Sequence, residues 1–447
     1  MKPLSLILLV LFGFLSPALA GETLTLEEAR HLALKANPEI LARGHEVSAA
    51  RAARRAEWGR LLPQVDLLAQ YRRLSDPQAV IPIKGPGQFP AFSRDLYDFA
   101  FTLSLPLYEG GRLRRRVRIA ELETAFRESL RRQTALDLLA NVEETFYLGL
   151  YLKDLISAQE KSLEALRRLY RETRLKERLG RVPPLDRLRM ETQLKAEEAA
   201  LAASREALVR AKEALAVLLG RPPATDFELS GELPSAEGAP PEPDWERVLS
   251  CRPDLAAARA ALSQAREAVR LAWGEHLPAL ELFSDYGRRA GAGLNHSEEV
   301  WEAGLRLRLN LFSGGTISSR VAEARARELA ARERLRATEL SARREVAAAL
   351  SLLSQSLAEV EHYRAALASA REAFRVESLK YRTGAGTVTD TLLAQAAWFQ
   401  AEADLHRAFF DYAKAWVAYR RATAGIAGSL LKLPCAVAQS AEKGVQP

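Results

Sequence analysis

The sequence has few cysteines, few aromatic residues and few lysines. Of its 447 residues, two are cysteine and 7% are aromatic, and the 64 basic residues comprise 52 arginines and 12 lysines. Two cysteines are too few for a framework of disulfides, and the low aromatic content predicts a core built mainly from Ala, Leu and Val. With 48% apolar and 27% charged residues, the composition excludes disordered and collagen-like chains.

The sequence also lacks the patterns of an enzyme or a nucleic-acid-binding protein. The net charge of +7 comes from arginines interleaved with glutamates along helical stretches, which is typical of solvated helix faces rather than of a basic patch. The six histidines show no metal-ligand spacing, and no nucleophile motif is present. We therefore expect no catalytic activity, no cofactor, no bound metal and no nucleic-acid partner.

Only the N-terminus carries a long hydrophobic run. Lys2 precedes an apolar segment from Leu4 to Leu15, and Ala18-Leu19-Ala20 provides a cleavage site, so residues 1–20 are predicted to be a secretory signal peptide. An uncleaved anchor is the alternative, but the run is short for a membrane span. No later segment has the length and hydropathy of a transmembrane helix, so the mature chain is expected to hold no membrane by helices.

The mature chain is an internal duplication. Residues 37–73 recur 215 positions later with 14 identities in 37, and "LPLYEGGR" (105–112) recurs 204 positions later as "LNLFSGGT". The change of offset falls between Arg73 and Phe99, in a Pro- and Gly-rich stretch predicted to be a surface loop. We expect a first repeat at residues 21–220, a Pro-rich linker at 221–243, a second repeat at 244–425 and a loose tail at 426–447.

Each repeat is predicted to begin with a helix that leads into two amphipathic strands. In the first repeat the helix spans residues 25 to about 60 and opens with a capping box formed by Thr25 and Glu28. Apolar residues then alternate with polar ones in four segments of about ten residues, two in each repeat, and this is the length of a tilted transmembrane strand.

Long coiled-coil helices follow the strands. In the first repeat, 70 residues separate Gly110 from Gly180, and in the second repeat the same distance separates Gly314 from Gly384. Gly110 and Gly314 each begin a glycine pair, and almost no Gly or Pro lies within either run. Apolar residues in this run follow a heptad pattern. Helices of about 38 residues, 183–219 and 387–424, are expected after the turns.

Four amphipathic strands are too few to close a barrel, because bacterial barrels begin at about eight. An open sheet edge in lipid would leave backbone groups unpaired, so the strands are expected to pair with those of other copies of the chain. Two copies would give eight strands and three would give twelve, and the periodicity does not choose between them. The polar strand residues would then line an aqueous lumen: Arg72, Asp285, Arg306 and Arg308. A soluble two-sheet module capping a coiled coil is the alternative.

The chain resembles the outer-membrane efflux protein family of TolC-like exit ducts. The resemblance rests on the duplicated plan, on "LPLYEGGR" and "LNLFSGGT", and on the segments "LTLEEARHLALKANPEI", "LLGRPP" and "YRTGAGTVTDTLLAQ". It implies a mainly α fold with a transmembrane β-barrel, in which a homotrimer forms a twelve-strand barrel in the outer-membrane lipid and a helical tunnel in the periplasm. It also implies docking to a periplasmic adaptor (membrane fusion) protein and an inner-membrane transporter.

The resemblance assigns candidate sites to the hairpin turns. Family members close the tunnel with aspartates six and nine residues after the second turn glycine. Asp390 holds the first position and Leu393 replaces the second. Asp186 is the equivalent residue of the first repeat. Asp390 could equally form a capping box with Thr387. The predicted adaptor-docking residues surround the two turn glycines: Leu179, Gly180, Arg181, Val182, Arg382, Thr383, Gly384 and Ala385. C-terminal helix capping is the simpler role for the arginines.

The leading interpretation is therefore the passive outer-membrane exit duct of a tripartite efflux pump for drugs or other small molecules. The outer-membrane component of a type I protein secretion system is the main alternative. A periplasmic adaptor would need a β-domain flanking a single hairpin, and a structural envelope coiled coil gives no reason for amphipathic strands. A disulfide between Cys251 and Cys435 remains an open prediction.

Overall fold

The structure is a computed structural model that describes residues 23–81, 85–87, 89–236, 238 and 242–427. The predicted signal peptide at residues 1–20 and residues 428–447 of the predicted tail lie outside the described residues. The described chain is mainly helical and carries a four-stranded sheet, as the sequence predicted. It forms two compact units, each built from both repeats, and the positions of the units relative to one another are not determined.

Eight α-helices form most of the described chain, four from each repeat. Those of the first repeat are α1 (Leu26–Ala36), α2 (Pro38–Gly59), α3 (Arg112–Arg178) and α4 (Pro184–Leu218). Those of the second are α5 (Trp245–Cys251), α6 (Pro253–Trp273), α7 (Thr316–Thr383) and α8 (Val388–Ala422). Single 3-10 turns occur at η1 (Gly274–His276), η2 (Ala292–Leu294) and η3 (Gly425–Ala427). No helix in the described ranges combines the length and the apolar character needed to cross a membrane.

The prediction of one continuous helix at residues 25 to about 60 is wrong, because the helix breaks at Asn37. Asn37 is extended, with φ −64° and ψ 125°, and α2 starts at Pro38. The residue before a proline is excluded from the helical region by contact with the proline ring. Arg252, before Pro253, has almost the same angles and separates α5 from α6. The capping box of Thr25 and Glu28 at the start of α1 is confirmed.

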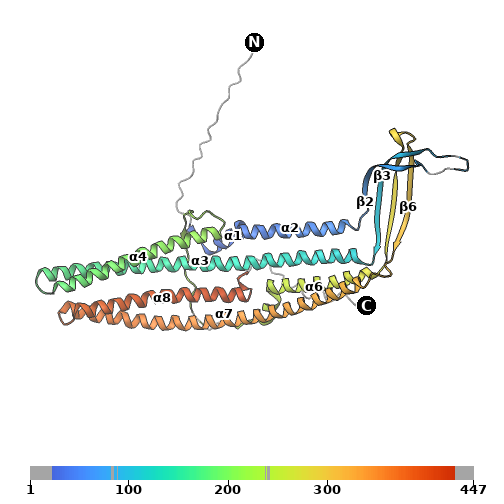
Figure 1. The fold of residues 1–447 in the computed structure, drawn as a ribbon. Coiled ribbons are helices and arrows are strands. Elements are labelled where there is room, and N and C mark those ends of the chain that lie inside the picture. Colours follow the sequence, from blue (N-terminus) through green and yellow to red (C-terminus); the bar gives the residue numbers. More distant parts are fainter. Residues whose placement is uncertain (1–22, 82–84, 88, 237, 239–241, 428–447) are drawn as a thin grey trace, which may run out of the picture. The chain divides into compact units, whose positions relative to one another are not determined.

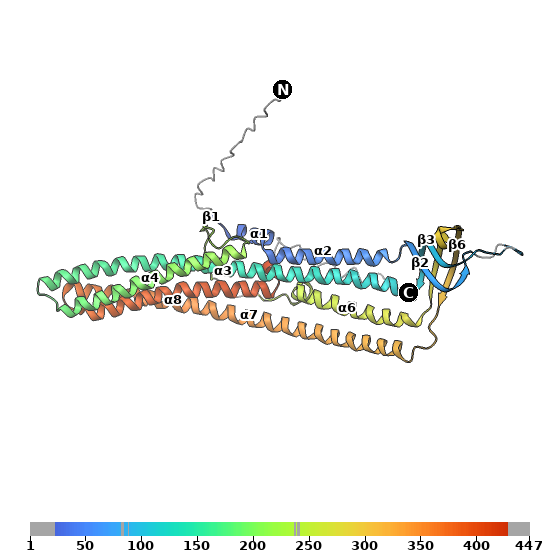
Figure 2. The ribbon, with the colours of Figure 1, turned by 45° about the horizontal axis from the view of Figure 1, so that its top comes forward.

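The first unit contains two antiparallel helical hairpins. It comprises the described parts of residues 1–37, 138–239 and 352–417. The second half of α3 pairs with α4, and the second half of α7 pairs with α8 (Figures 1 and 2). Leu139, Val142, Phe146 and Leu150, which follow the heptad pattern on α3, are buried. The two-residue strands β1 (Thr23–Leu24) and β4 (Glu228–Leu229) pair in parallel beside this bundle.

The second unit contains the antiparallel sheet and the helices next to it. Its strands are β2 (Gln64–Ala79), β3 (Phe92–Glu109), β5 (Ala279–Ala290) and β6 (Glu298–Arg308), hydrogen-bonded in the order β2-β3-β5-β6. Strands β2 and β3 have 16 and 18 residues, so the prediction of about ten residues is wrong for the first repeat. Both strands extend into the predicted loop, and the register shifts between Arg73 and Gln78.

Glycine allows a close backbone approach where the strands lead into the helices. Gly110 has φ +61°, and a Cβ atom added there would lie 2.3 Å from the carbonyl oxygen of Gly274. A side chain at this position would therefore meet both backbone strain and a direct clash. The glycine pair thus sets the turn from β3 into α3.

Candidate functional site

The two hairpin turns of the first unit have the same construction. At the first turn, Gly180 has φ +66° and the Arg181 N–H donates to the Lys176 carbonyl at 2.8 Å. At the second, Gly384 has φ +82° and the Ala385 N–H donates to the Lys380 carbonyl at 2.9 Å. This six-to-one hydrogen bond closes a helix only when a left-handed residue follows its end. Both glycines therefore act as helix terminators.

The residues predicted to dock an adaptor lie at the surface of these turns. Leu179 is 59% exposed although it is apolar. The other exposed members of the predicted set are Gly180, Arg181, Arg382, Thr383, Gly384 and Ala385, and Val182 is half-buried. The residues of this predicted set thus present backbone, arginine side chains and one large apolar side chain to the solvent.

The two hairpins contact each other just behind their turns. Tyr381 of α7 is 4% exposed and packs against Met190 of α4 and Val388 of α8. Its hydroxyl lies 3.2 Å from the Thr173 hydroxyl of α3, and the Lys176 ammonium lies 3.8 Å from the centre of its ring. A buried phenol requires such a hydrogen-bond partner. Tyr381 was not predicted from the sequence, because its burial depends on the other hairpin.

The predicted gate residue Asp390 is hydrogen-bonded to Thr387, the residue that precedes α8. The Thr387 hydroxyl donates to the Asp390 carboxylate at 2.6 Å, and the Asp390 N–H donates to the Thr387 hydroxyl oxygen at 3.1 Å. The carboxylate is exposed, and it contributes with Glu377, which has the larger effect, to raising the pKa of Lys380 above its ordinary value. Capping and a charge facing solvent are compatible at a helix N-terminus.

The equivalent aspartate of the first repeat lies in a different setting. Asp186 is half-buried in the first turn of α4, where Pro183 and Pro184 replace the capping threonine. At the position of the second family aspartate, Leu393 is 65% exposed. The structure therefore places Asp186 and Asp390, the two predicted gate aspartates, each in the first turn of the helix that follows its hairpin turn.

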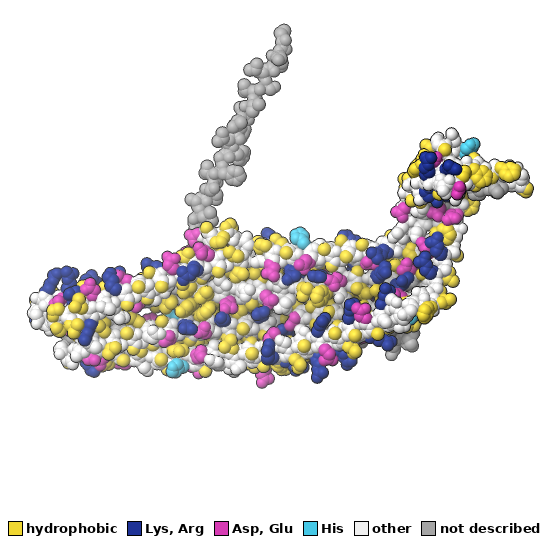
Figure 3. Space-filling view, in the orientation of Figure 1, with side chains coloured by type: hydrophobic (Ala, Val, Ile, Leu, Met, Phe, Trp, Pro, Cys, Tyr) yellow, Lys and Arg dark blue, Asp and Glu magenta, His cyan; other side chains and the backbone are white. Residues whose placement is uncertain are grey.

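Basic side chains gather at the first turn, as Figure 3 shows at the end of the α3–α4 hairpin. Residues 167–189 carry nine basic and three acidic side chains. The basic ones are Arg167, Arg168, Arg171, Arg174, Lys176, Arg178, Arg181, Arg187 and Arg189. One acidic side chain, Glu177, is paired with Arg187 at 3.0 Å. Sequence analysis could have found this excess by counting charges around the turn.

The predicted lumen residues share the polar face of the sheet. Arg72 is paired with Asp98 at 2.9 Å, and Asp98 also accepts from Arg289 at 2.5 Å. Arg306 is paired with Glu281 at 3.3 Å. Arg308 and Asp285 lie on the same face by strand register. Sequence analysis missed Asp98, Arg289 and Glu281, although their parity along the strands places them with the predicted residues.

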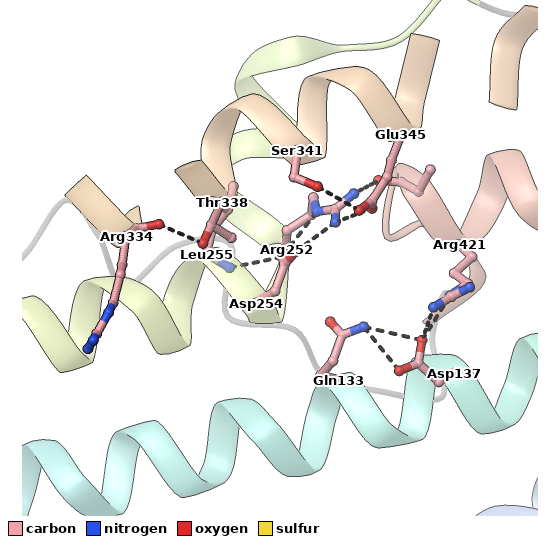
Figure 4. A network of polar contacts seen from close by, with 11 residues as sticks. Gln133, Asp137, Arg252, Asp254, Leu255, Arg334, Thr338, Ser341, Glu345 and Arg421 are labelled. Carbon is pink, nitrogen blue, oxygen red and sulfur yellow. Dashed lines mark hydrogen bonds and ion pairs between the residues drawn. The ribbon is translucent and has the colours of Figure 1, made fainter. Parts of the chain in front are cut away.

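A polar network of the second unit surrounds Arg252, next to Cys251 (Figure 4). Arg252 is 6% exposed and pairs with Asp254 and with Glu345 of α7, both at 2.7 Å. It also donates to the carbonyl of Ala422, the last residue of α8, at 2.9 Å. The guanidinium thus holds the start of α6 against two other helices. Cys435 lies outside the described residues, so its predicted disulfide with Cys251 stays a prediction.

Two duplicated helical hairpins joined to a sheet with one apolar and one polar face define a channel-forming protein of the outer-membrane type. The model of the outer membrane efflux protein family matches residues 29–221 and 245–425, and the chain belongs to this family. The matched segments fall on the two repeats.

Several known proteins resemble the chain, some over most of its length and one over about a third of it. TolC of Vibrio cholerae is 24% identical, and the match covers 92% of each chain. The match to TolC of Escherichia coli is 27% identical and covers 35% of that protein. The alkaline protease secretion protein AprF of Pseudomonas aeruginosa is 26% identical, with 89% of this chain and 84% of AprF covered. The solved outer-membrane channel OprN has the same fold, with a TM-score of 0.78, 23% identity and 90% of each chain covered.

Proposed function

We propose that this chain is the outer-membrane exit duct of a tripartite efflux pump. Three copies would form a twelve-strand barrel in the outer membrane, and their helices would continue as a tunnel in the periplasm. The duct would conduct drugs or other small molecules passively and would carry out no chemistry. Membership of the outer membrane efflux protein family supports this proposal.

The observation that carries the proposal is the sheet, which among the described residues has two unpaired edge strands and one apolar face. Strands β2 and β6 are its edges. Apolar side chains on one face are strongly exposed, including Leu67 (66%), Phe101 (57%) and Leu305 (64%). A face of this kind is suited to lipid, and unpaired strand edges in lipid would cost several kcal/mol for each backbone group. Pairing β2 of one copy with β6 of the next gives the backbone groups of both edges hydrogen-bond partners and leaves the apolar face to the lipid.

Membrane fractionation and gel electrophoresis test this assembly. We expect the mature chain in the outer-membrane fraction, migrating as a trimer band that converts to a monomer on heating. A periplasmic adaptor or a structural envelope coiled coil would instead give no heat-modifiable trimer. Recovery of a monomer in the soluble fraction would contradict the proposal.

We propose further that the hairpin turns dock a periplasmic adaptor that links the duct to an inner-membrane transporter. The exposed Leu179 and the excess of basic side chains in residues 167–189 favour this role. Replacing Leu179 or Arg181 by Asp should abolish drug resistance while the trimer still forms. The control is Arg332→Asp on an exposed part of α7 far along the sequence from the turns, which should leave resistance unchanged.

We propose that Asp390 and Asp186 are gate residues, and two variants of Asp390 separate this role from helix capping. Asp390→Asn removes the charge but keeps an oxygen that can accept from Thr387, whereas Asp390→Ala removes both. If Asp390 controls the pore, both variants change the cation block or the open probability of single channels in planar bilayers. If Asp390 acts as a cap only, neither conductance property changes and Asp390→Ala alone lowers stability, by about 1 kcal/mol.

A duct for protein secretion is the second candidate, and the similarity to AprF over 89% of this chain favours it. Deleting the gene distinguishes the two functions. Loss of drug resistance with unchanged protein secretion supports efflux, and the reverse result supports secretion.

A further inference from the structure

A large cavity of the second unit lies where the strands meet the long helices. Its volume is about 850 Å³, which is within the range of small-molecule sites. The cavity is lined by the start of β2, the ends of β3 and β6, the start of β5, and the first turns of α3 and α7. Neither the proposed gate nor the proposed docking surface includes it.

The two repeats contribute equivalent positions to this cavity. Arg116 of α3 and Arg320 of α7 both line it and are related by the offset of 204 residues, as are Arg112 and Thr316. The first turns of α3 and α7 contain no acidic residue. Each follows a glycine pair, which has no side chain to accept from the first N–H groups of the helix. Two positive helix ends therefore add to the charge of the arginines.

The cavity carries an excess of cationic side chains. Six arginines and three glutamates line it. Each of the three glutamates pairs with an arginine of the lining: Glu109 with Arg112 at 3.6 Å, Glu275 with Arg320 at 2.8 Å, and Glu281 with Arg306 at 3.3 Å. Arg60 pairs with Glu57, which lies outside the lining, at 3.7 Å. Within the part of the chain that the structure describes, Arg116 and Arg308 have no acidic partner. Two guanidinium groups are thus available to a ligand.

Strand register places the cavity on the polar side of the sheet. Gln64 pairs with Ser104, and Glu281 pairs with Arg306, all on the face that carries Arg72 and Asp285. The opposite face carries Leu67, Phe101 and Leu305. A solute in the proposed lumen would therefore reach the cavity, whereas lipid would contact the other face.

We propose that this cavity binds small polyanionic solutes carrying carboxylate or phosphate groups. Guanidinium groups hold both kinds of anion through paired hydrogen bonds, and Arg116 and Arg308 are the groups that remain for this purpose. The inference rests on the proposed function, because a solute reaches the cavity only if the chain forms the proposed duct. It gives the duct a preference for anionic cargo at the base of the sheet.

Calorimetric titration of the purified full chain with citrate tests the inference. In nanodiscs of zwitterionic lipid at low salt, we expect saturable binding that weakens as sodium chloride is added. Arg116→Gln and Arg308→Gln should each weaken binding about 3- to 10-fold, and the double variant by more than about 10-fold. Arg332→Gln, a matched loss of one exposed arginine outside the cavity, should bind as the unchanged protein does.

Lysine variants and anionic lipid complete the test. Arg116→Lys and Arg308→Lys keep the charge but lose the paired geometry, so they should bind citrate with intermediate affinity even if the glutamine variants fail to assemble. Unchanged binding by the double glutamine variant or by the lysine pair would overturn the inference. The inference would also be overturned if citrate did not bind while phosphatidylglycerol nanodiscs showed a lipid contact that depends on Arg116. The cavity would then hold a lipid headgroup rather than a solute.

Binding and export fail independently of each other. Citrate binding without loss of drug resistance on gene deletion contradicts the proposed efflux function alone. Drug resistance that depends on the gene, together with no citrate binding, contradicts the anion site alone.

Discussion

A glycine at a helix turn and a glycine inside a helix differ in what opposes the addition of a side chain. Gly384 has φ +82°, and a Cβ atom added there meets nothing within 4 Å, so only backbone strain opposes substitution. Gly44 lies inside α2 with open space around it and no positive φ. Space alone therefore does not decide the effect of adding a methyl group.

Gly384→Ala and Gly44→Ala should have opposite effects on stability. The first should destabilise by about 1–2 kcal/mol, because a left-handed residue with a Cβ is strained. The second should stabilise by about 0.5–1 kcal/mol, because glycine costs conformational entropy in a helix interior. Chemical denaturation of the purified protein, followed by circular dichroism, measures both. Equal effects of the same sign would contradict this account.

Glu197 and Glu198 of α4 are neighbours, and their negative charges should have opposite effects on the stability of the protein at neutral pH. Burial raises the pKa of the Glu197 carboxyl, and the nearby Ser162 hydroxyl opposes part of this rise. Hydrogen bonds from Lys195 and Arg167 lower the pKa of Glu198. A raised carboxyl pKa contributes stability that is present below the ordinary glutamate range and is lost as the pH rises through the raised value.

Glu197→Gln should therefore stabilise the protein at neutral pH and change little near about pH 4, where glutamate is largely protonated. Glu198→Gln should destabilise at neutral pH, because its lowered pKa contributes stability above the ordinary range that is lost as the pH falls. Thermal denaturation of both variants from pH 4 to pH 8 tests the signs. A parallel pH dependence of the two variants would show that burial does not control Glu197.

At the scale of elements, a buried ion pair fixes α1 to α3 in the first unit. The Arg30 guanidinium lies 2.6 Å from the Glu143 carboxylate, and their side chains are 9% and 0% exposed. Removing one partner of a buried pair leaves an uncompensated charge, whereas replacing both with apolar groups is often tolerated. The short α1 helix thus depends on a polar contact that the sequence pattern does not reveal.

Arg30→Met should cost about 3–5 kcal/mol of stability, and the double variant Arg30→Met with Glu143→Leu should recover most of that loss. Arg375→Met, which breaks an exposed pair whose side chains are 65% and 60% exposed, should cost less than about 1 kcal/mol. Denaturant titrations of the three variants give the comparison. A double variant as unstable as Arg30→Met would exclude the ion pair as the cause.

Much of the element order was accessible from the sequence. The 204-residue offset and the glycine pairs located α3 and α7. Alternation located the four strands, although β6 ends at Arg308, before the last alternating residues Leu309 and Leu311. The break at Asn37 was missed, although Pro38 signals it by the rule for residues that precede proline. The extra length of β2 and β3 could not be predicted, because the end of β2 depends on the pairing of Gln78 with Ser93 and of Ala79 with Phe92 rather than on its own pattern.

At the scale of the whole molecule, the two faces of the sheet should respond differently to charge. Phe101 lies on the apolar face and its neighbour Thr102 on the polar face, opposite Asp66 and Asp285. In the proposed assembly, Phe101 contacts lipid and Thr102 contacts the lumen. One residue along the same strand therefore changes the environment completely.

Phe101→Arg should prevent the trimer from forming, because an arginine facing lipid costs about 2–4 kcal/mol near the middle of the membrane in each copy. Thr102→Arg should assemble normally, since it places the charge beside two aspartates. The yield of heat-modifiable trimer in the outer-membrane fraction measures the difference. Equal yields would place both faces in the same environment and would contradict the barrel.

The sequence by itself determined the helices, the strands and the two faces of the sheet. It did so through local or periodic properties, namely the low aromatic content, the duplication and the alternation of apolar and polar residues. Only the tertiary structure decided which distant side chains meet. Tyr381 is buried because a second hairpin covers it, and Arg116 and Arg308 share a cavity because two strand ends and two helix starts converge there. Burial and charge balance depend on such non-local contacts, and periodicity within one segment contains no information about them.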